Sequence, residues 1–410
     1  MGKKLLVAQS GGPTSAINAT LAGVIEAAIR NPEVSDVLGA RYGIQGVLRE
    51  QFLDLSGIEH IEDMLATLAV TPAAALGSCR FKLKDPAQDP SEFEELIRIF
   101  QKHEIGYFVY IGGNDSMDTV WKLSDYIKEH HIPDIVVVGA PKTIDNDLYG
   151  IDHCPGFGSA AKYIATSISE LERELEVYDT PYVIVVEMMG RNAGWLTAAA
   201  ALAESANSNV PYLIYLEERP FDLNDFISDL RGELAVGKDV IVAISEGIRD
   251  RSGKMICDYA DRDQSTDAFG HTIATGAGKV LENAIRSNIG CKVRYIELNL
   301  LQRCAGHLLS ETDITESTEL GRNAVRLAVD GQNGVMSTLT RTSNQPYSVA
   351  YGAADIADIA DREKKVPDSW ITSEGNGVTE EMLEYLRPLV QGERSCKFEN
   401  GIPKYVVFDK

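Results

Sequence analysis

Residues 135–147 read IVVVGAPKTIDND, an apolar run that leads directly into polar and charged side chains. The β-branched residues that open the stretch are typical of a buried strand. Two carboxylates follow at i and i+2, Asp145 and Asp147, beside a lysine and a threonine. In open parallel sheets, ligands bind beyond the carboxyl ends of the strands. The stretch therefore predicts a strand of an α/β fold with chemistry at its end.

The run at 135–138 is one of a series. Short apolar runs alternate with segments in which apolar residues recur at helical spacing. Strands are expected at 5–8, 108–111, 135–138, 183–186, 213–215, 240–244 and 293–296, and helices at 17–28, 93–100, 164–175 and 194–203. This alternation predicts an α/β fold with parallel sheets and helices on both of their faces.

The length and composition suit a large intracellular protein. The 410 residues, 44% of them hydrophobic, exceed one ordinary core and suit two α/β lobes. No membrane span is expected, because no apolar stretch reaches about 18 residues. The apolar run after Met1-Gly-Lys-Lys is too short for a secretory signal. The six scattered cysteines form no C-x-x-C pair, as expected of reduced thiols in a cytoplasmic protein.

The charge balance limits the partners. The net charge is −22, from 61 acidic and 39 basic residues. A surface this acidic repels nucleic acid and anionic membranes, so neither is expected as a partner. A small anionic substrate would need a site where Arg, Lys and backbone N–H groups are concentrated.

Two glycine-rich segments follow predicted strands and precede predicted helices. Residues 10–14 read SGGPT, and residues 112–116 read GGNDS. Glycines let the backbone approach an anion, and a helix N-terminus offers free N–H groups. In the second segment, Asn114 and Asp115 add oxygen ligands suited to a phosphate with its metal. A plain strand-to-helix turn and helix capping are the structural alternatives, although capping would not require two adjacent glycines.

Further charged clusters follow later strands. Residues 187–194 read EMMGRNAG, which places the planar fork of Arg191 where it can hold a phosphate. Glu246 follows another strand and is suited to sugar hydroxyls. The last cluster runs from Arg294 to Arg303. Each cluster alone is compatible with a solvated surface, whereas their joint order is harder to explain that way. The structural alternative for residues 142–147 is likewise a solvated turn. The apolar strand directly before them disfavours this alternative.

Taken together and in order, these motifs resemble the 6-phosphofructokinase family over roughly residues 4–325. The shared motifs are Gly-Gly near the N-terminus, Gly-Ser-x-Arg-Phe at 77–81, Gly-Gly-x-x-Ser at 112–116, Thr-Ile-Asp-Asn-Asp at 143–147, Met-Gly-Arg at 189–191, Ser-Glu-Gly at 245–247 and Gln-Arg at 302–303. Thr-Ile-Asp-Asn-Asp and Met-Gly-Arg together are highly specific to that family.

The resemblance implies a phosphofructokinase fold of two Rossmann-like lobes with the active site in the cleft between them. The phosphoryl-donor lobe would comprise residues 1–156 plus 302–352. The fructose 6-phosphate lobe would comprise residues 157–301 plus 353–410, the latter containing a C-terminal extension without an assigned role. A homodimer or homotetramer is expected from the family.

The resemblance also implies roles for individual residues. Asp145 would be the base that takes the proton from the sugar 1-hydroxyl, with Lys142, Asp115 and Arg191 as further catalytic residues. Fructose 6-phosphate would be bound by Thr143, Asp145, Asp147, Met189, Gly190, Arg191, Glu246, Arg294 and Arg303. The phosphoryl donor would be bound by Gly12, Arg80, Gly113 and Lys142. Mg²⁺ would be bound by Asn114, Asp115 and Asp147.

Two positions indicate which donor is used. ATP-using members of the family carry glycine where this chain has Asp115 and Lys142, whereas pyrophosphate-using members carry Asp and Lys. Asp115 adds bulk and charge where a nucleotide would need room, and Lys142 adds a compact cation for a small inorganic donor. We therefore expect Mg²⁺-assisted, reversible phosphorylation of fructose 6-phosphate by pyrophosphate, a glycolytic step.

The sequence departs from the family pattern at two informative places. Asn114 stands where an acidic metal ligand is usual, so the metal would depend on Asp115 or Asp147. Tyr182 stands where many members carry an arginine that reaches the neighbouring subunit. The alternatives are an ATP-dependent enzyme, an NAD or lipid kinase, and a catalytically silent regulatory subunit. The presence of Asp145 and its charged neighbours disfavours the silent subunit.

Overall fold

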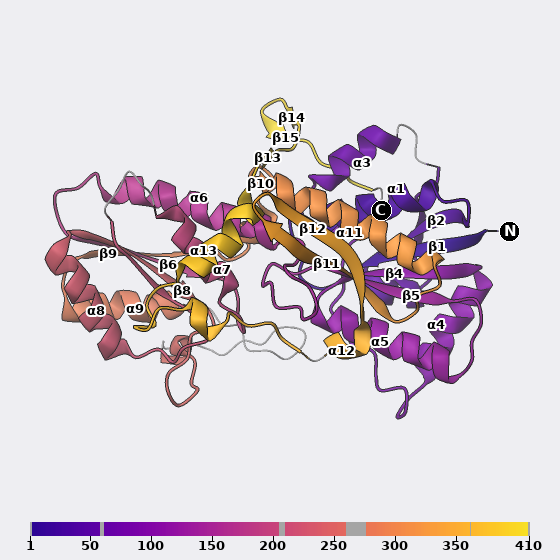
Figure 1. Ribbon diagram of the computed structural model, residues 1–410, viewed down its shortest axis with the longest axis horizontal. Helices are drawn as coiled ribbons and strands as arrows, with labels where there is room; N and C mark the ends of the chain where they lie inside the picture. Colours follow the sequence, from indigo (N-terminus) through magenta and orange to yellow (C-terminus); the bar gives the residue numbers. More distant parts are fainter. Residues whose placement is uncertain (1, 58–60, 205–209, 260–275, 361, 409–410) are drawn as a thin grey trace.

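The computed structural model describes residues 2–57, 61–204, 210–259, 276–360 and 362–408. Its strands form two main sheets at opposite ends of an elongated molecule (Figure 1). The larger sheet has the order β12-β11-β5-β4-β1-β2-β3. Its strands are β1 (Lys3–Gln9), β2 (Val34–Ala40), β3 (Phe52–Asp54), β4 (Ile105–Gly112), β5 (Val136–Pro141), β11 (Val335–Asn344) and β12 (Tyr347–Asp355).

The smaller sheet has the order β7-β8-β6-β9, and all of its strands are parallel. Its strands are β6 (Tyr182–Met188), β7 (Tyr212–Tyr215), β8 (Asp239–Ser245) and β9 (Lys292–Glu297). Every residue of β6 and β8 is buried. A strand covered on both faces needs a continuous apolar run, which is the pattern seen in the sequence.

Helices cover both faces of the larger sheet. Along β1, Leu5 and Val7 join one apolar cluster while Leu6 and Ala8 join another, because successive side chains point to opposite faces. The first cluster is covered by α1 (Ile17–Ile29), α3 (Ile61–Ala69) and α11 (Glu311–Val329). The second is covered by α2 (Gly43–Leu48), α4 (Ser91–Lys102), α5 (Asn114–Glu129) and α12 (Ile356–Ile359).

The smaller sheet is covered in the same way. One face packs against α6 (Phe157–Leu175), α7 (Trp195–Ala198), η1 (Ala199–Ala203), α13 (Glu380–Leu386) and η4 (Arg387–Val390). The other face packs against α8 (Leu223–Val236), η2 (Ile256–Tyr259) and α9 (Ala277–Asn288). The remaining short elements are α10 (Leu301–Cys304), β10 (Leu309–Ser310), η3 (Asp368–Trp370), β13 (Glu393–Arg394), β14 (Phe398–Glu399) and β15 (Ile402–Pro403).

The strands and helices expected from the sequence are present, and the α/β fold is confirmed. Two features differ from the expectation. The larger sheet is mixed, because β3 and β12 pair antiparallel at its two edges. The segment at 194–203 is an α-helix only over Trp195–Ala198 and then tightens into a 3₁₀-helix. None of the helices in the described ranges is long and apolar enough to cross a membrane.

The C-terminal extension packs against both sheets. Met382, Tyr385 and Leu386 of α13 join the core of the smaller sheet. Tyr405 and Phe408 instead pack against the cluster between the larger sheet and its helices. The C-terminal extension therefore contributes apolar side chains to the packing on both sheets.

Candidate active site

A cavity opens where strands of the two sheets end. In the larger sheet Gln9 pairs with Ile111, and Gly112 pairs with Pro141, so the loops that follow β1, β4 and β5 lie side by side. The loop after β6 and Glu246 after β8 face them. The cavity has a volume of about 390 Å³ and is lined by Gly11, Gly12, Pro13, Thr14, Arg80, Gly113, Asn114, Asp115, Ser116, Lys142, Thr143, Ile144, Asp145, Asp147, Met189, Arg191, Asn192, Glu246, Arg303 and Glu363.

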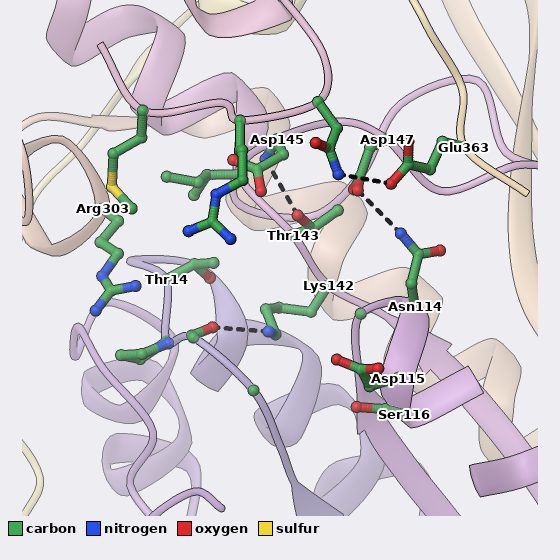
Figure 2. A pocket seen from close by; sticks show the side chains of 18 of the residues that line it. Thr14, Asn114, Asp115, Ser116, Lys142, Thr143, Asp145, Asp147, Arg303 and Glu363 are labelled. Carbon is green, nitrogen blue, oxygen red and sulfur yellow. Dashed lines mark hydrogen bonds between the residues drawn. The ribbon is translucent and has the colours of Figure 1, made fainter. Parts of the chain in front are cut away.

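Both carboxylates of the segment that follows β5 face this cavity (Figure 2). The residue between them, Asn146, is fully buried and has a left-handed backbone with φ of 56°. The backbone N–H of Asp145 donates to Thr143 Oγ1 at 3.1 Å. The loop is therefore anchored by its middle residue, which leaves Asp145 and Asp147 pointing into the cavity.

Lys142 is enclosed between the two glycine-rich loops. Its side chain is 3% exposed, and its ammonium donates to the carbonyl oxygen of Gly12 at 2.7 Å. Burial lowers the pKa of Lys142 to about 8, although the nearby Asp145 acts in the opposite direction. The cation is thus held where an anion in the cavity would meet it without intervening solvent.

The glycines of the first loop make room for cations. A Cβ added to Gly12 would lie 2.9 Å from Nη1 of Arg303, and one added to Gly11 would lie 3.2 Å from Nζ of Lys142. Gly11 also has a φ of 76°, which side chains rarely adopt. The two glycines therefore let Arg303 and Lys142 converge on one anion-binding region.

The helix α5 begins in the same cavity. Gly113 precedes its first residue, Asn114, so the free N–H groups of the first turn face the cavity. Asn114 Nδ2 donates to Asp147 Oδ2 at 2.9 Å, which turns the amide oxygen the other way. That oxygen is buried and has no hydrogen-bond partner among the described residues. A buried oxygen without a hydrogen-bond partner is available as a metal ligand.

Arg191 and Glu246 form the wall contributed by the smaller sheet. Gly190, with φ of 115°, turns the chain after β6, and its N–H donates to Glu246 Oε1 at 3.3 Å. The Nε of Arg191 is buried without a hydrogen-bond partner in the ranges that the structure describes. Burial and the charge of Asp145 raise the pKa of Glu246 to about 8. The wall thus offers an unsatisfied guanidinium donor beside a carboxyl group.

Burial also raises the pKa of Asp145, against the lowering effects of Lys142, Arg303 and Arg191. The pKa of Asp147 is raised by burial and by the like charge of Asp145. A carboxylate whose pKa is raised accepts a proton more readily. The geometry therefore supports a general base at Asp145.

The cavity offers oxygen ligands that suit Mg²⁺. The described residues contain no group of three His, Cys, Asp or Glu side chains placed to hold a metal ion. Mg²⁺, however, commonly binds through one or two carboxylates together with substrate phosphates. The unpaired oxygen of Asn114 and the carboxylates of Asp115 and Asp147 line the same side of the cavity (Figure 2). These groups fit a magnesium ion that reaches the cavity with its phosphate.

The cavity lining includes every predicted site residue except Gly190 and Arg294. Gly190 lies just behind the lining, between Met189 and Arg191. Arg294 is exposed on β9, where it pairs with Ile184 well before the carboxyl end of β6. Its side chain lies beside Tyr182, away from the cavity. One chain therefore does not bring Arg294 to its own site.

The sequence analysis missed Glu363, which enters the cavity from the C-terminal extension (Figure 2). Its carboxylate accepts a hydrogen bond from Asn192 Nδ2 at 2.8 Å. Nothing in the polar segment around Glu363 signals such a position, because its neighbours in the cavity are far away in sequence.

Comparisons with known proteins find relatives along nearly the whole chain. The Phosphofructokinase family matches residues 4–328. A pyrophosphate–fructose 6-phosphate 1-phosphotransferase of Xanthomonas campestris pv. campestris is 43% identical over 407 residues, covering 98% of this chain and 95% of the relative. A pyrophosphate–fructose 6-phosphate 1-phosphotransferase of Halomonas elongata is 41% identical over 402 residues, which cover 97% of this chain and 94% of the relative. The crystal structure of a pyrophosphate-dependent phosphofructokinase from Nitrosospira multiformis has a TM-score of 0.88 at 37% identity. The match covers 98% of this chain and 96% of that chain.

Proposed function

The chain belongs to the phosphofructokinase family, and from that membership we propose how its cavity phosphorylates fructose 6-phosphate with pyrophosphate. The enzyme is a pyrophosphate-dependent phosphotransferase. The observation that carries the choice of donor is the joint presence of Lys142 and Asp115 in the cavity lining. We assign the larger lobe to pyrophosphate and the smaller lobe to the sugar phosphate.

Pyrophosphate binds between the two glycine-rich loops and the start of α5. The enclosed ammonium of Lys142 and the guanidinium of Arg80 neutralise its charge, and the N–H groups after Gly113 donate to its oxygens. Asp115 occupies space that a nucleotide would need. A small inorganic donor fits this arrangement better than ATP does.

Fructose 6-phosphate binds against the wall formed by the smaller sheet. Arg191 and Arg303 supply planar donor groups for its phosphate, and Glu246 accepts from its hydroxyls. Met189 and Thr143 complete the contact surface. This arrangement directs the 1-hydroxyl toward Asp145.

Asp145 accepts the proton of the 1-hydroxyl as the hydroxyl oxygen bonds to one phosphorus of pyrophosphate. The bond from that phosphorus to the bridging oxygen breaks, and inorganic phosphate leaves with the electron pair. Asn114, Asp115 and Asp147 would hold Mg²⁺, which would supply charge neutralisation on the donor. One phosphoanhydride is exchanged for one phosphate ester, so we expect the reaction to run readily in both directions.

We also propose that the chain forms a homodimer or homotetramer. Arg294 is exposed and lies outside the cavity of its own chain, so it contacts a 6-phosphate only in the site of a second copy. We expect sedimentation to give at least twice the 44.8 kDa of one chain. A single 44.8 kDa species at assay concentration would remove the proposal.

The first test compares pyrophosphate with ATP as donor to fructose 6-phosphate at matched concentrations with Mg²⁺. Fructose 1,6-bisphosphate is expected with pyrophosphate only, and a chelator should abolish its formation until Mg²⁺ is restored. Product with ATP only would identify an ATP-dependent enzyme. Product with neither donor would identify a catalytically silent subunit. If turnover continues in the presence of the chelator, the reaction does not require the metal ion.

The buried position of Lys142 gives an expected pH dependence. Because its pKa is lowered to about 8, the ammonium loses its charge as the pH rises through that value. We expect kcat/KM for pyrophosphate, which reports ionisations of the free enzyme, to fall above about pH 8. The comparison variant is Lys142→Arg, whose side chain stays charged at high pH. Its profile should remain flat to higher pH, and an identical decline in both proteins would contradict the assignment.

A further inference from the structure

The C-terminal extension sends one short segment to the back of the cavity. We call residues 362–366 the strap. Leu148 and Glu363 form an isolated antiparallel bridge, and the N–H of Lys364 donates to the carbonyl oxygen of Asp147 at 2.7 Å. The strap therefore runs alongside the loop that carries Asp145 and Asp147.

The anchor of that loop is the side chain of Asn146. Its oxygen accepts from the N–H of Cys154 at 2.9 Å, and its Nδ2 donates to the hydroxyl of Tyr385 at 2.8 Å. Asn146 stands between the two carboxylates and points away from the cavity. The direction of Asp145 therefore depends on what holds this amide in place.

The ammonium of Lys364 is the cation that reaches this anchor. It donates to Asn146 Oδ1 at 3.1 Å, to the carbonyl oxygen of Asp152 at 2.6 Å and to that of Ile151 at 3.3 Å. Three acceptors match the three N–H groups of an ammonium. Burial lowers the pKa of Lys364, as expected of a lysine enclosed by backbone carbonyls. All three contacts fall on the loop between β5 and α6, so the side chain ties Asn146 to the later part of the same loop.

The opposite side of the strap is attached to the smaller lobe. Trp195 Nε1 donates to the carbonyl oxygen of Lys364 at 2.9 Å, and Asn192 Nδ2 donates to Glu363 Oε1 at 2.8 Å. The N–H of Val366 donates to Glu218 Oε1 at 3.0 Å. Asn192 is adjacent to Arg191. The strap is thus fastened on one side to the loop of the base and on the other to the loop of the phosphate-binding arginine.

We propose that Lys364 is a positioning residue for phosphoryl transfer, which acts by holding the loop that carries Asp145 in register with the sugar-binding wall. The inference rests on the proposed function, because it requires Asp145 to act on a bound sugar hydroxyl. It gives the C-terminal extension a role in the reaction. General-base catalysis needs the base within hydrogen-bond reach of its proton, and a shift of about 1 Å can cost about 100-fold in rate.

The test begins with Lys364→Met, which keeps the length of the side chain and removes its three N–H donors. We expect kcat to fall by about 100-fold, while KM for each substrate changes less than about threefold. The matched control is Lys365→Met in the same strap. That side chain is 57% exposed, and its nearest carboxylate is Glu217 at 3.7 Å, so activity should be unchanged. A loss below about threefold for Lys364→Met would overturn the proposal.

A double-mutant cycle separates positioning from a general structural role. Lys364→Met is combined with Asp145→Asn and compared with each single variant. A residue that acts through Asp145 should cost less than about threefold once that carboxylate is absent, because coupled residues are not additive. A residue that only supports the fold costs the same factor in both backgrounds, and that outcome would overturn the proposal.

A second variant covers the case in which Lys364→Met does not fold. Tyr385→Phe removes only the hydroxyl that accepts from Asn146 and donates to the carbonyl oxygen of Asp152 at 2.8 Å. Tyr385→Phe is combined with Asp145→Asn in the same double-mutant cycle. If the two losses of kcat are additive, the proposal that the strap positions Asp145 is contradicted. The wild-type enzyme assayed in parallel keeps the two hypotheses apart. An inactive wild type would contradict the proposed function, whereas an active wild type with additive losses would contradict only the role of the strap.

Discussion

Asp145→Asn is expected to lower turnover by about 100-fold to 10,000-fold, which corresponds to about 2.7–5.4 kcal/mol of activation free energy. The amide matches the carboxylate in size but accepts no proton. In the wild type the backbone N–H of Asp145 donates to Thr143 Oγ1 at 3.1 Å. The variant keeps this backbone donor, so the loop should keep its shape. The measurement is kcat at saturating fructose 6-phosphate and pyrophosphate, with KM for both.

The control for this variant is Asp125→Asn, which removes the same charge from an exposed position on α5 outside the cavity. It should leave kcat within about twofold, because surface substitutions have small effects. An Asp145→Asn loss smaller than about tenfold would show that another group takes the proton. A large rise in KM with little change in kcat would instead indicate that Asp145 only binds the sugar.

The second large effect is expected from replacing both Asp115 and Lys142 by glycine. Activity with pyrophosphate should fall by about 100-fold or more, because a buried cation that faces the transferred phosphoryl group is lost. Activity with ATP should rise above that of the wild type, because the two glycines vacate space beside the start of α5. The measurement is kcat/KM for each donor, and the ratio of the two values reports the change in specificity.

The two single variants separate the contributions. Lys142→Gly should account for most of the loss with pyrophosphate, because its ammonium lies 2.7 Å from the carbonyl oxygen of Gly12 in the donor region. Asp115→Gly should account for most of the gain with ATP. Glycine in the first turn of α5 costs up to about 1 kcal/mol of stability, so thermal melting should accompany the assays. If ATP stays inert in the double variant, the steric explanation of donor choice is wrong.

The parts of the fold that the sequence predicted are those with strong local patterns. β4 and β6 are buried at every residue, and each contains a short apolar run, at 108–111 and 183–186, that marks it in the sequence. The strands β11 and β12 were missed. β12 alternates between half-buried and exposed residues at one edge of the sheet, which leaves only a weak apolar pattern. Pairing at such an edge depends on the neighbouring strand more than on local composition.

The site residues also divide into those that a local sequence pattern predicts and those that it does not. Lys142, Asp145 and Arg191 stand directly after buried strands, so their positions in the cavity could be predicted from the sequence alone. Glu363 could not, because it follows no strand and reaches the cavity only through the packing of the extension. Arg294 shows the opposite case. It lies on a predicted strand, but its place along the strand, before the carboxyl end, keeps it from its own cavity.

The course of the chain between the lobes also has a mechanical consequence. Among the described residues, the chain passes from one lobe to the other after β5, after β9, after β12 and again between η4 and Tyr405. Lobes joined by a single linker can rotate about any axis, whereas several separated connections restrict them to small rotations about one shared axis. We expect such a molecule to behave as a stiff hinge, with little configurational entropy left to lose when its two substrates meet.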